Sequence, residues 1–187
     1  MRTALAATWT LLLGMALLML GAGLQGTLVG LRASLEGFPT LLAGIMLAAY
    51  YLGYMVGSVM TPPLVNSVGH VRVFAALTSL ASALILLQGV FVAPLPWTLV
   101  RILMGFCFAG IYVVAESWLN GRVDNEHRGL LLSIYMLVCY GGLGLGQLLL
   151  NVADPRSTVL FILVSILISV AMVPMALSIG VPPGYVV

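Results

Sequence analysis

The sequence predicts an all-α, polytopic membrane protein with six transmembrane helices. Hydrophobic residues make up 62% of the chain and charged residues only 6%, whereas soluble domains carry about 25% charged residues. The charges lie in short clusters, and the stretches between them contain none: residues 3–31, 37–69, 73–100, 129–153 and 157–187, with a further apolar run from Arg101 to Glu116. Because about 20 apolar helical residues cross the roughly 30 Å core of a bilayer, these gaps predict six spans.

The six spans are expected at residues 8–31, 40–60, 72–92, 97–119, 129–150 and 158–177, within a single domain of residues 1–187. Helix breakers separate several of them. Pro39 precedes the second span, Pro62 and Pro63 follow it, and Pro155 precedes the sixth. Pro174 lies inside the last span, where a membrane helix tolerates it.

The distribution of arginine favours an N-terminus in the cytoplasm, because loops on that side of a membrane carry more cations. In this orientation four arginines lie on the inner side and two on the outer side: Arg2, Arg72, Arg122 and Arg128 inside, Arg32 and Arg156 outside. The chain is therefore expected as a multi-pass protein of the cell membrane. The three tryptophans fall near predicted span ends, where this residue anchors helices at the interface: Trp9, Trp97 and Trp118.

Small residues at four-residue spacing predict close helix crossings. They occur in the first, second and fifth spans, as Gly26 and Gly30, as Ala49, Gly53 and Gly57, and as Gly142 and Gly146. Glycines also repeat at an offset of 84 residues, which pairs Gly21, Gly26, Gly37 and Gly57 with Gly105, Gly110, Gly121 and Gly141. This offset superposes spans 1–3 on spans 4–6 in opposite orientation, so we expect a three-plus-three inverted repeat.

Intramembrane enzyme chemistry is not expected. His70 and His127 lie in predicted loops, so no histidine inside the membrane could activate a serine nucleophile. Asp124 and Asp154 also lie in loops, which leaves no intramembrane aspartyl pair. No group of residues has metal-ligand spacing, and a net charge of +2 is too small to indicate nucleic-acid binding. We expect neither a catalytic site nor a cofactor.

Residues 64–72, between spans two and three, resemble the loop signature of the major facilitator superfamily, which reads roughly G-x-L-A-D-R-x-G-R-R. Leu64 and Gly69 match it, Asn66 replaces the aspartate, and Arg72 falls one or two places late, two residues after His70. Two further segments are similar to elements of that family: Arg101 followed by Gly105 at the start of span four, and residues 125–129 with Glu126 and Arg128 before span five.

Residues 68–74, 116–120 and 146–149 resemble more specifically the YcaD-like bacterial branch of this superfamily. The resemblance covers the whole chain but only the N-terminal half of the family's usual twelve spans. It implies half of a secondary transporter in the bacterial inner membrane, which carries a small molecule by alternating access, coupled to protons. The opposing half would be a second copy or a separately encoded partner. The alternative is a truncated or non-transporting six-helix protein that acts only by association with other membrane proteins.

Arg101 and Glu116 are the charged site candidates. The resemblance suggests that Arg101 couples transport to proton movement, and the alternative is an arginine that snorkels to the outer interface. Glu116 lies about 22 Å further along the same helix at 1.5 Å per residue, too far to pair with Arg101. It is either a protonatable gate carboxylate or a member of an interfacial ion pair with Arg72, Arg122 or Arg128.

Long polar amides lie inside three spans, as Gln25, Gln88 and Gln147. A buried amide costs free energy unless it is hydrogen-bonded, so each should face another helix or a cavity. Hydrogen bonding between helices accounts for all three. Cavity lining is the other interpretation, chiefly for Gln25, because the resemblance places spans one and four beside the central pathway, and also for Gln147, which follows a glycine-rich run.

Overall fold

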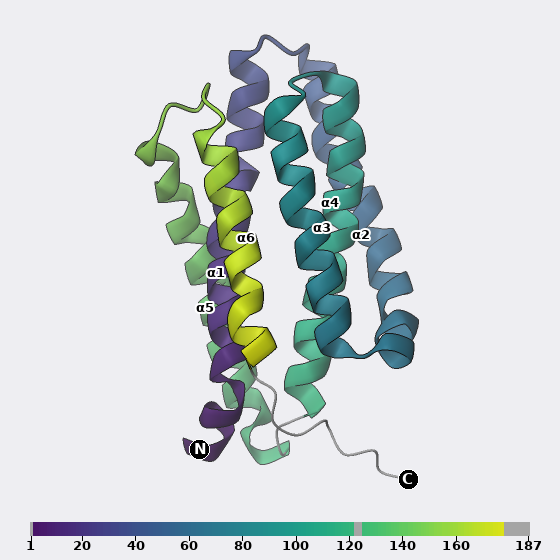
Figure 1. Ribbon diagram of the computed structural model, residues 1–187, viewed down its shortest axis with the longest axis vertical. Coiled ribbons are helices and arrows are strands. Elements are labelled where there is room, and N and C mark those ends of the chain that lie inside the picture. Colours follow the sequence, from purple (N-terminus) through teal and green to yellow (C-terminus); the bar gives the residue numbers. More distant parts are fainter. Residues whose placement is uncertain (1, 122–124, 178–187) are drawn as a thin grey trace.

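A computed structural model describes the backbone of residues 2–121 and 125–177 and the side chains of residues 8–121 and 128–177. Six α-helices run along one direction with alternating sense (Figure 1). They are α1 (Arg2–Leu35), α2 (Thr40–Val68), α3 (His70–Val90), α4 (Pro94–Gly121), α5 (Asn125–Leu148), which continues into the 3₁₀ turn Leu149–Val152, and α6 (Val159–Leu177). All six are long and apolar enough to cross a membrane. The expected all-α, six-span architecture is confirmed.

The connection between α2 and α3 is much shorter than the sequence predicted. Instead of ending near residue 60, α2 continues through Pro62 and Pro63 to Val68. Gly69 alone separates it from α3, with φ +95°, a backbone conformation that glycine adopts without a steric penalty. Membrane helices tolerate internal proline, so the two prolines do not end the span. The family-like segment is therefore helical on both sides of one glycine.

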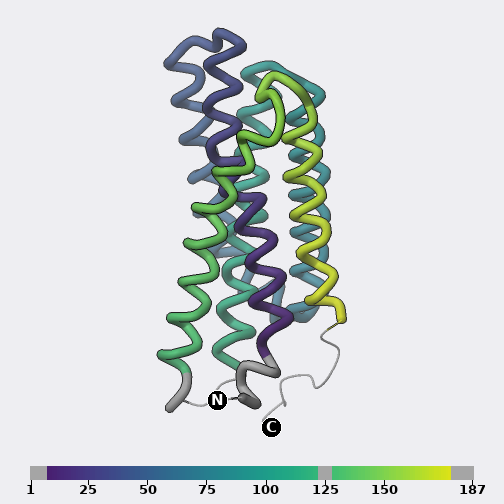
Figure 2. The backbone as a smooth tube through the Cα atoms, turned by 90° about the vertical axis from the view of Figure 1, so that its left-hand side faces the viewer, coloured from purple at the N-terminus to yellow at the C-terminus, as the bar shows by residue number. Residues whose placement is uncertain are grey.

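The helices form an open series, here called the arc, in which each packs mainly on its neighbours. Figure 2 shows α5 and α1 side by side in this series. The order along the arc is α5, α1, α6, α3, α4 and α2, because the extensive contacts are α1 with α5 and α6, α3 with α4 and α6, and α2 with α4. The two end helices are the least buried. Only 22% of the apolar stretch of α2 and 28% of that of α5 is buried, against 56–61% for α1, α3 and α4. Most of the surface of α2 and α5 therefore lacks a protein neighbour.

The crossing of α3 and α6 lies on a pseudo-two-fold axis. Ser82 Oγ is 2.7 Å from Ser165 Oγ, and each of these hydroxyls is also 3.2 Å from the other residue's carbonyl oxygen. Such reciprocal contacts arise where a two-fold axis passes through an interface. The rotation exchanges α1 with α4, α2 with α5 and α3 with α6, which reproduces the packing order of the arc. This is the expected three-plus-three inverted repeat.

Glycines let the helices touch at two crossings that this rotation relates. At the crossing of α2 and α4, a Cβ on Gly53 would overlap the carbonyl oxygen of Ile102, and one on Gly105 would overlap that of Tyr50. Where α1 meets α5, a Cβ on Gly23 would overlap the Leu143 carbonyl, and one on Gly146 the Leu20 carbonyl. Small residues allow this close backbone approach.

The glycines paired by the offset of 84 do not have equivalent roles. Gly105 packs against α2, whereas Gly21 faces α6, and Gly57 packs against α4, whereas Gly141 has nothing within 4 Å. The inverted repeat is thus present in the packing, but insertions between the halves shift the equivalent residues. The three tryptophans predicted near span ends differ in burial. Trp9 is 56% exposed, but Trp97 and Trp118 are buried.

Candidate functional site

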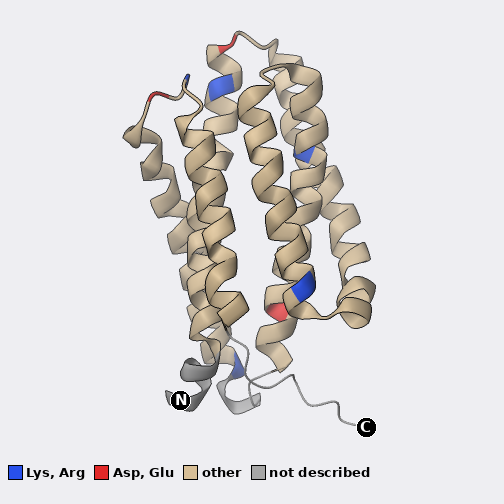
Figure 3. Ribbon diagram, viewed as in Figure 1, with Lys and Arg blue, Asp and Glu red and all other residues tan. Residues whose placement is uncertain are grey.

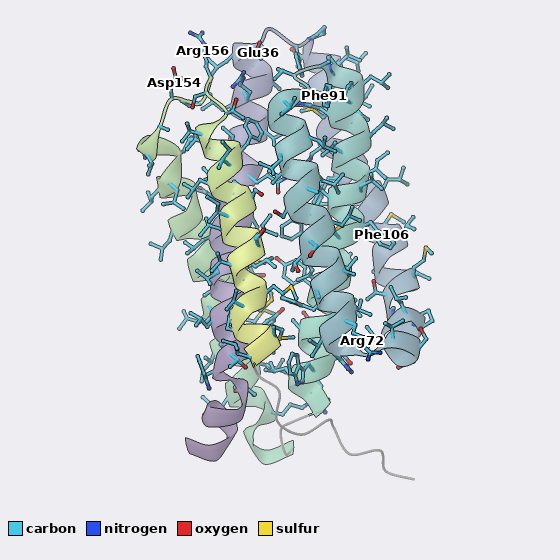
Figure 4. All side chains as sticks on the ribbon, in the orientation of Figure 1. Glu36, Arg72, Phe91, Phe106, Asp154 and Arg156 are labelled. Carbon is cyan, nitrogen blue, oxygen red and sulfur yellow. The ribbon has the colours of Figure 1, made fainter. Side chains whose placement is uncertain are left out.

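The two ends of the bundle differ in their charged residues. Glu36, Asp154 and Arg156 lie at one end, here called the Glu36 end, and Arg72 lies at the other, the Arg72 end (Figure 4). Charged residues gather toward these ends and leave a long uncharged stretch between them (Figure 3). Arg101 is the exception to this arrangement, because it lies two turns into α4 from Pro94 and is only 8% exposed.

The guanidinium of Arg101 is stacked on an aromatic ring. Its Cζ lies 4.5 Å from the centroid of the Tyr50 ring, which belongs to α2. The close approach of α2 and α4 at Gly105 brings the Tyr50 backbone against α4 and so holds this ring over the cation. A cation over an aromatic face is attracted by the ring quadrupole. The glycine crossing therefore produces the contact.

The charge of Arg101 has no acidic partner in the described part of the chain. Within that part, the ion pair observed joins Arg32 to Glu36. The Nε atom of Arg101 is buried and donates no hydrogen bond within that part either. An arginine that snorkels would extend its charged end to the interface, whereas this side chain is largely buried and lies against Tyr50.

A row of half-buried tyrosines continues from Arg101 along α2 and α4. The Tyr50 and Tyr54 centroids are 6.2 Å apart, and those of Tyr54 and Tyr112 are 6.4 Å apart. We call Tyr50, Tyr54 and Tyr112 the tyrosine row. Arg101 and Tyr112 are eleven residues apart and so share one face of α4. The Tyr112 hydroxyl donates a hydrogen bond to Met19 Sδ at 3.0 Å, which turns this face toward α1.

Glu116 lies one turn beyond Tyr112 on α4 and is exposed. It forms no ion pair with Arg72 or Arg128 in the described part of the chain, and Arg122 lies outside the described residues. Arg128 Nε instead donates to Asn120 Oδ1 at 2.8 Å. Arg101 and Glu116 lie toward opposite ends of the tyrosine row.

The amides predicted to line a cavity differ in their burial. Gln25 is buried, with Nε2 lacking a hydrogen-bond partner, and Gln147 is exposed on α5. Gln88, on α3, is fully buried, with neither side-chain amide atom partnered. Its backbone oxygen accepts a hydrogen bond from Trp97 Nε1 at 2.8 Å, which ties the start of α4 to the end of α3.

The residues of the family-like segment lie around Gly69 at the Arg72 end. Leu64, Asn66 and Arg72 are exposed. His70 Nε2 lies 3.0 Å from Ser117 Oγ, which links the start of α3 to the end of α4. Of the predicted loop before span five, Asn125 already begins α5, and the side chain of Glu126 lies outside the described residues.

The tyrosine row is the part of the site that sequence reasoning missed. Three tyrosines within five residues, Tyr50, Tyr51 and Tyr54, were the available signal, since an apolar span has no need of phenolic hydroxyls. Their hydroxyls require hydrogen-bond partners when buried. The pattern did not show which of them would face α4.

Comparisons with known proteins show the family of this chain. The sequence model of the family described as the Major Facilitator Superfamily matches residues 5–185. The chain belongs to this superfamily. Proteins from Salmonella typhimurium strain LT2 and Salmonella typhi, each named "Uncharacterized MFS-type transporter YcaD", are 35% identical to it over 141 residues. That alignment covers 75% of the chain but 37% of each relative.

The chain thus matches well under half the length of these major facilitator relatives. No solved structure matches. Membership and six apolar helices together make the chain a multi-pass membrane protein of a transporter family. The resemblance to the YcaD-like branch in the sequence is confirmed.

Proposed function

We propose that residues 1–187 form one six-helix domain that works as the N-terminal half of a major facilitator secondary transporter in the bacterial inner membrane. The observation that carries this proposal is the pair of end helices, α2 and α5, whose surfaces lack protein neighbours on both sides of the face formed by α1 and α4. An opposing half seated on α2 and α5 would enclose this face. The small molecule would then be exposed to each side of the membrane in turn.

The opposing half is a second copy of this chain or another six-helix domain. Both would have to cover the apolar residues that α2 and α5 expose, among them Tyr51, Met55, Leu137 and Tyr140. The alternative function, association with other membrane proteins without transport, uses the same surfaces. A readout of transport is therefore needed to separate the two.

Proton coupling would act through Arg101 indirectly. Arginine stays protonated in proteins, so its guanidinium cannot carry the transported proton. It can instead bind a negatively charged group, and the release of that group would depend on the protonation of another residue. Glu116, at the far end of the tyrosine row, is the titratable candidate, and Gln25 and Gln147 are the uncharged gate or cavity candidates. The N-terminus and the Arg72 end would face the cytoplasm.

The residues around Gly69 would form a cytoplasmic latch against the opposing half. Leu64, Asn66 and Arg72 are exposed there, and His70 is tied to α4. Asn66 carries no charge, so this latch would depend on amide hydrogen bonds and on Arg72. Glu126 and Arg128 would support it from the start of α5.

The experiment is substrate-dependent proton movement in proteoliposomes that contain the chain and an internal pH-sensitive dye. A panel of small organic anions, cations and sugars is added outside, and cross-linking in the same vesicles reports on self-association. We expect at least one compound to change the internal pH, and Arg101→Ala to abolish the change. Arg156→Ala, at an exposed arginine of the Glu36 end, is the matched control and should retain it.

A chain that stays monomeric and moves protons with no compound would contradict transport by this chain alone. If Arg101→Ala leaves the pH change intact in an active preparation, the coupling role of Arg101 is wrong. Co-expression with a candidate second half then tests whether activity depends on that partner.

A further inference from the structure

The positive charge of Arg101 is not balanced by an acidic side chain among the described residues. A buried charge is costly unless it is paired and hydrogen-bonded, and charged groups within membrane spans usually pair with one another or face a functional cavity. Arg101 is 8% exposed, with Nε buried and unpartnered. Among the described acidic side chains, Glu36 is paired with Arg32, Asp154 lies at the Glu36 end, and Glu116 is about 22 Å along α4.

Tyr50 satisfies one side of the guanidinium only. Its ring covers a face of the cation, at 4.5 Å from Cζ to the centroid. The N–H groups of a guanidinium point outward from its edge, in a fork that matches a carboxylate. An aromatic face cannot accept those hydrogen bonds in the plane of the guanidinium. The edge of Arg101 therefore requires an acceptor from outside the described part of the chain.

The tyrosine row offers flat apolar surface next to this edge. Tyr50, Tyr54 and Tyr112 follow each other at centroid distances of 6.2 and 6.4 Å, and all three are only half-buried. The Tyr112 hydroxyl donates to a thioether, which is a weak acceptor. The row can therefore pack against a planar ring, and the Tyr112 hydroxyl can exchange its weak partner for a ligand oxygen.

We propose that Arg101 and the tyrosine row form a binding site for a small aromatic carboxylate. The carboxylate binds the edge of the Arg101 guanidinium, and the ring packs against Tyr54, the neighbour of Tyr50 in the row. One negative charge neutralises Arg101, whereas a dianionic phosphate would leave an excess charge inside the membrane. An organic cation is repelled by Arg101. The proposal rests on the proposed transport function and names its substrate class.

The test measures binding to the purified chain in detergent by the shift in its unfolding temperature and by isothermal titration. The probes are benzoate, its neutral analogue benzamide, the cation benzylammonium, the small anion acetate and inorganic phosphate. We expect saturable binding of benzoate, and binding weaker by at least about tenfold for benzamide and acetate, because one lacks the charge and the other the ring. Benzylammonium and phosphate should not bind.

Variants of Arg101 and of Tyr54 measure separately how the charge and the aromatic ring contribute to benzoate affinity. We expect Arg101→Gln to lower benzoate affinity by at least about tenfold, and Arg101→Lys to lower it less, because lysine keeps the charge without the fork. Tyr54→Leu should weaken benzoate more than acetate, while Tyr54→Phe keeps the ring and the affinity. Arg156→Gln is the control for loss of a cation elsewhere. The Lys and Phe variants give a result even if Arg101→Gln fails to fold.

Equal binding of benzamide and benzoate, or unchanged benzoate affinity in Arg101→Gln, would overturn the proposal. Its failure is distinguishable from failure of the transport function. If vesicles move protons with a sugar or a cation but the chain does not bind benzoate, transport stands and the substrate class is wrong. If benzoate binds through Arg101 but no vesicle transports, the site stands and transport by this chain is wrong.

Discussion

Two arginines in this protein are almost equally buried, yet only one has its charge compensated. Arg32, on α1, is 9% exposed and Arg101 is 8% exposed. Arg32 Nε donates to Glu36 Oε1 at 2.6 Å, and its Nη1 donates to the carbonyl oxygens of Pro155, at 3.0 Å, and of Arg156. It therefore ties the end of α1 to the connection before α6. Arg32 thus has a structural environment, whereas Arg101 has no acidic partner among the described residues, which is the basis for proposing it as a binding residue.

Replacing Arg32 should therefore affect stability. We expect Arg32→Gln to lower the free energy of unfolding by about 1–3 kcal/mol, because two carbonyl oxygens and a carboxylate lose a charged donor. Thermal unfolding in detergent measures the change. Arg156→Gln is the matched control, since its side chain is exposed and its backbone N–H, which donates to Asp154 Oδ1, is kept. Equal effects of the two variants would contradict a specific role for Arg32.

At the scale of the elements, glycine determines which helices can touch. The crossings of α1 with α5 and of α2 with α4 are each closed by glycines whose missing Cβ makes room for a carbonyl oxygen of the other helix. Gly144 lies two residues before Gly146 on the same helix, but a Cβ added to it would have no atom within 4 Å. The two positions therefore separate the packing effect of a methyl group from its effect on helix propensity.

We expect Gly146→Ala to destabilise the chain by about 1–3 kcal/mol, because the added Cβ forces α5 away from Leu20 of α1. Gly144→Ala should be neutral or stabilising by up to about 1 kcal/mol, because alanine has the higher helix propensity and the site is open. Thermal unfolding of both variants in one detergent measures the difference. A stabilising Gly146→Ala would show that this crossing is looser than described.

The number of spans could be predicted from the sequence, because the charge gaps record it directly. The inverted repeat was also predicted, but the glycine offset of 84 does not pair residues with equivalent packing roles. The orientation of each helix about its axis could not be predicted. In a membrane helix both the lipid-facing and the protein-facing sides are apolar, so the pattern does not separate buried Trp97 from exposed Trp9. Arg101 was identified as a candidate because a charge inside a span is rare, but its contact with Tyr50 depends on a crossing with α2 that the pattern does not specify.

At the scale of the whole molecule, the bundle is two three-helix units related by a pseudo-two-fold axis through Ser82 and Ser165. Because the units are inverted, the connections of one unit lie at the opposite end from their counterparts in the other. The charges at the two ends then decide the orientation in the membrane, and the inner side is expected to be the Arg72 end.

Cysteine labelling of intact cells tests this orientation. We expect a membrane-impermeant maleimide to label Asp154→Cys, at the Glu36 end, without permeabilisation, and Ser67→Cys, at the other end, only after it. Both positions are exposed. The native Cys107 and Cys139 are buried, so the unsubstituted chain gives the background. The reverse labelling pattern would place the N-terminus outside the cytoplasm.

The single residue between α2 and α3 has a mechanical consequence. Because only Gly69 joins them, α2 and α3 can hardly move independently of each other. The connection between α5 and α6 is longer. A tilt of α2 must therefore be taken up by φ and ψ of Gly69 or passed to α3. The helix α2 lies at the end of the arc, and α3 lies on the pseudo-two-fold axis. A displacement of α2 by a partner is therefore transmitted to the centre of the domain through the backbone of Gly69.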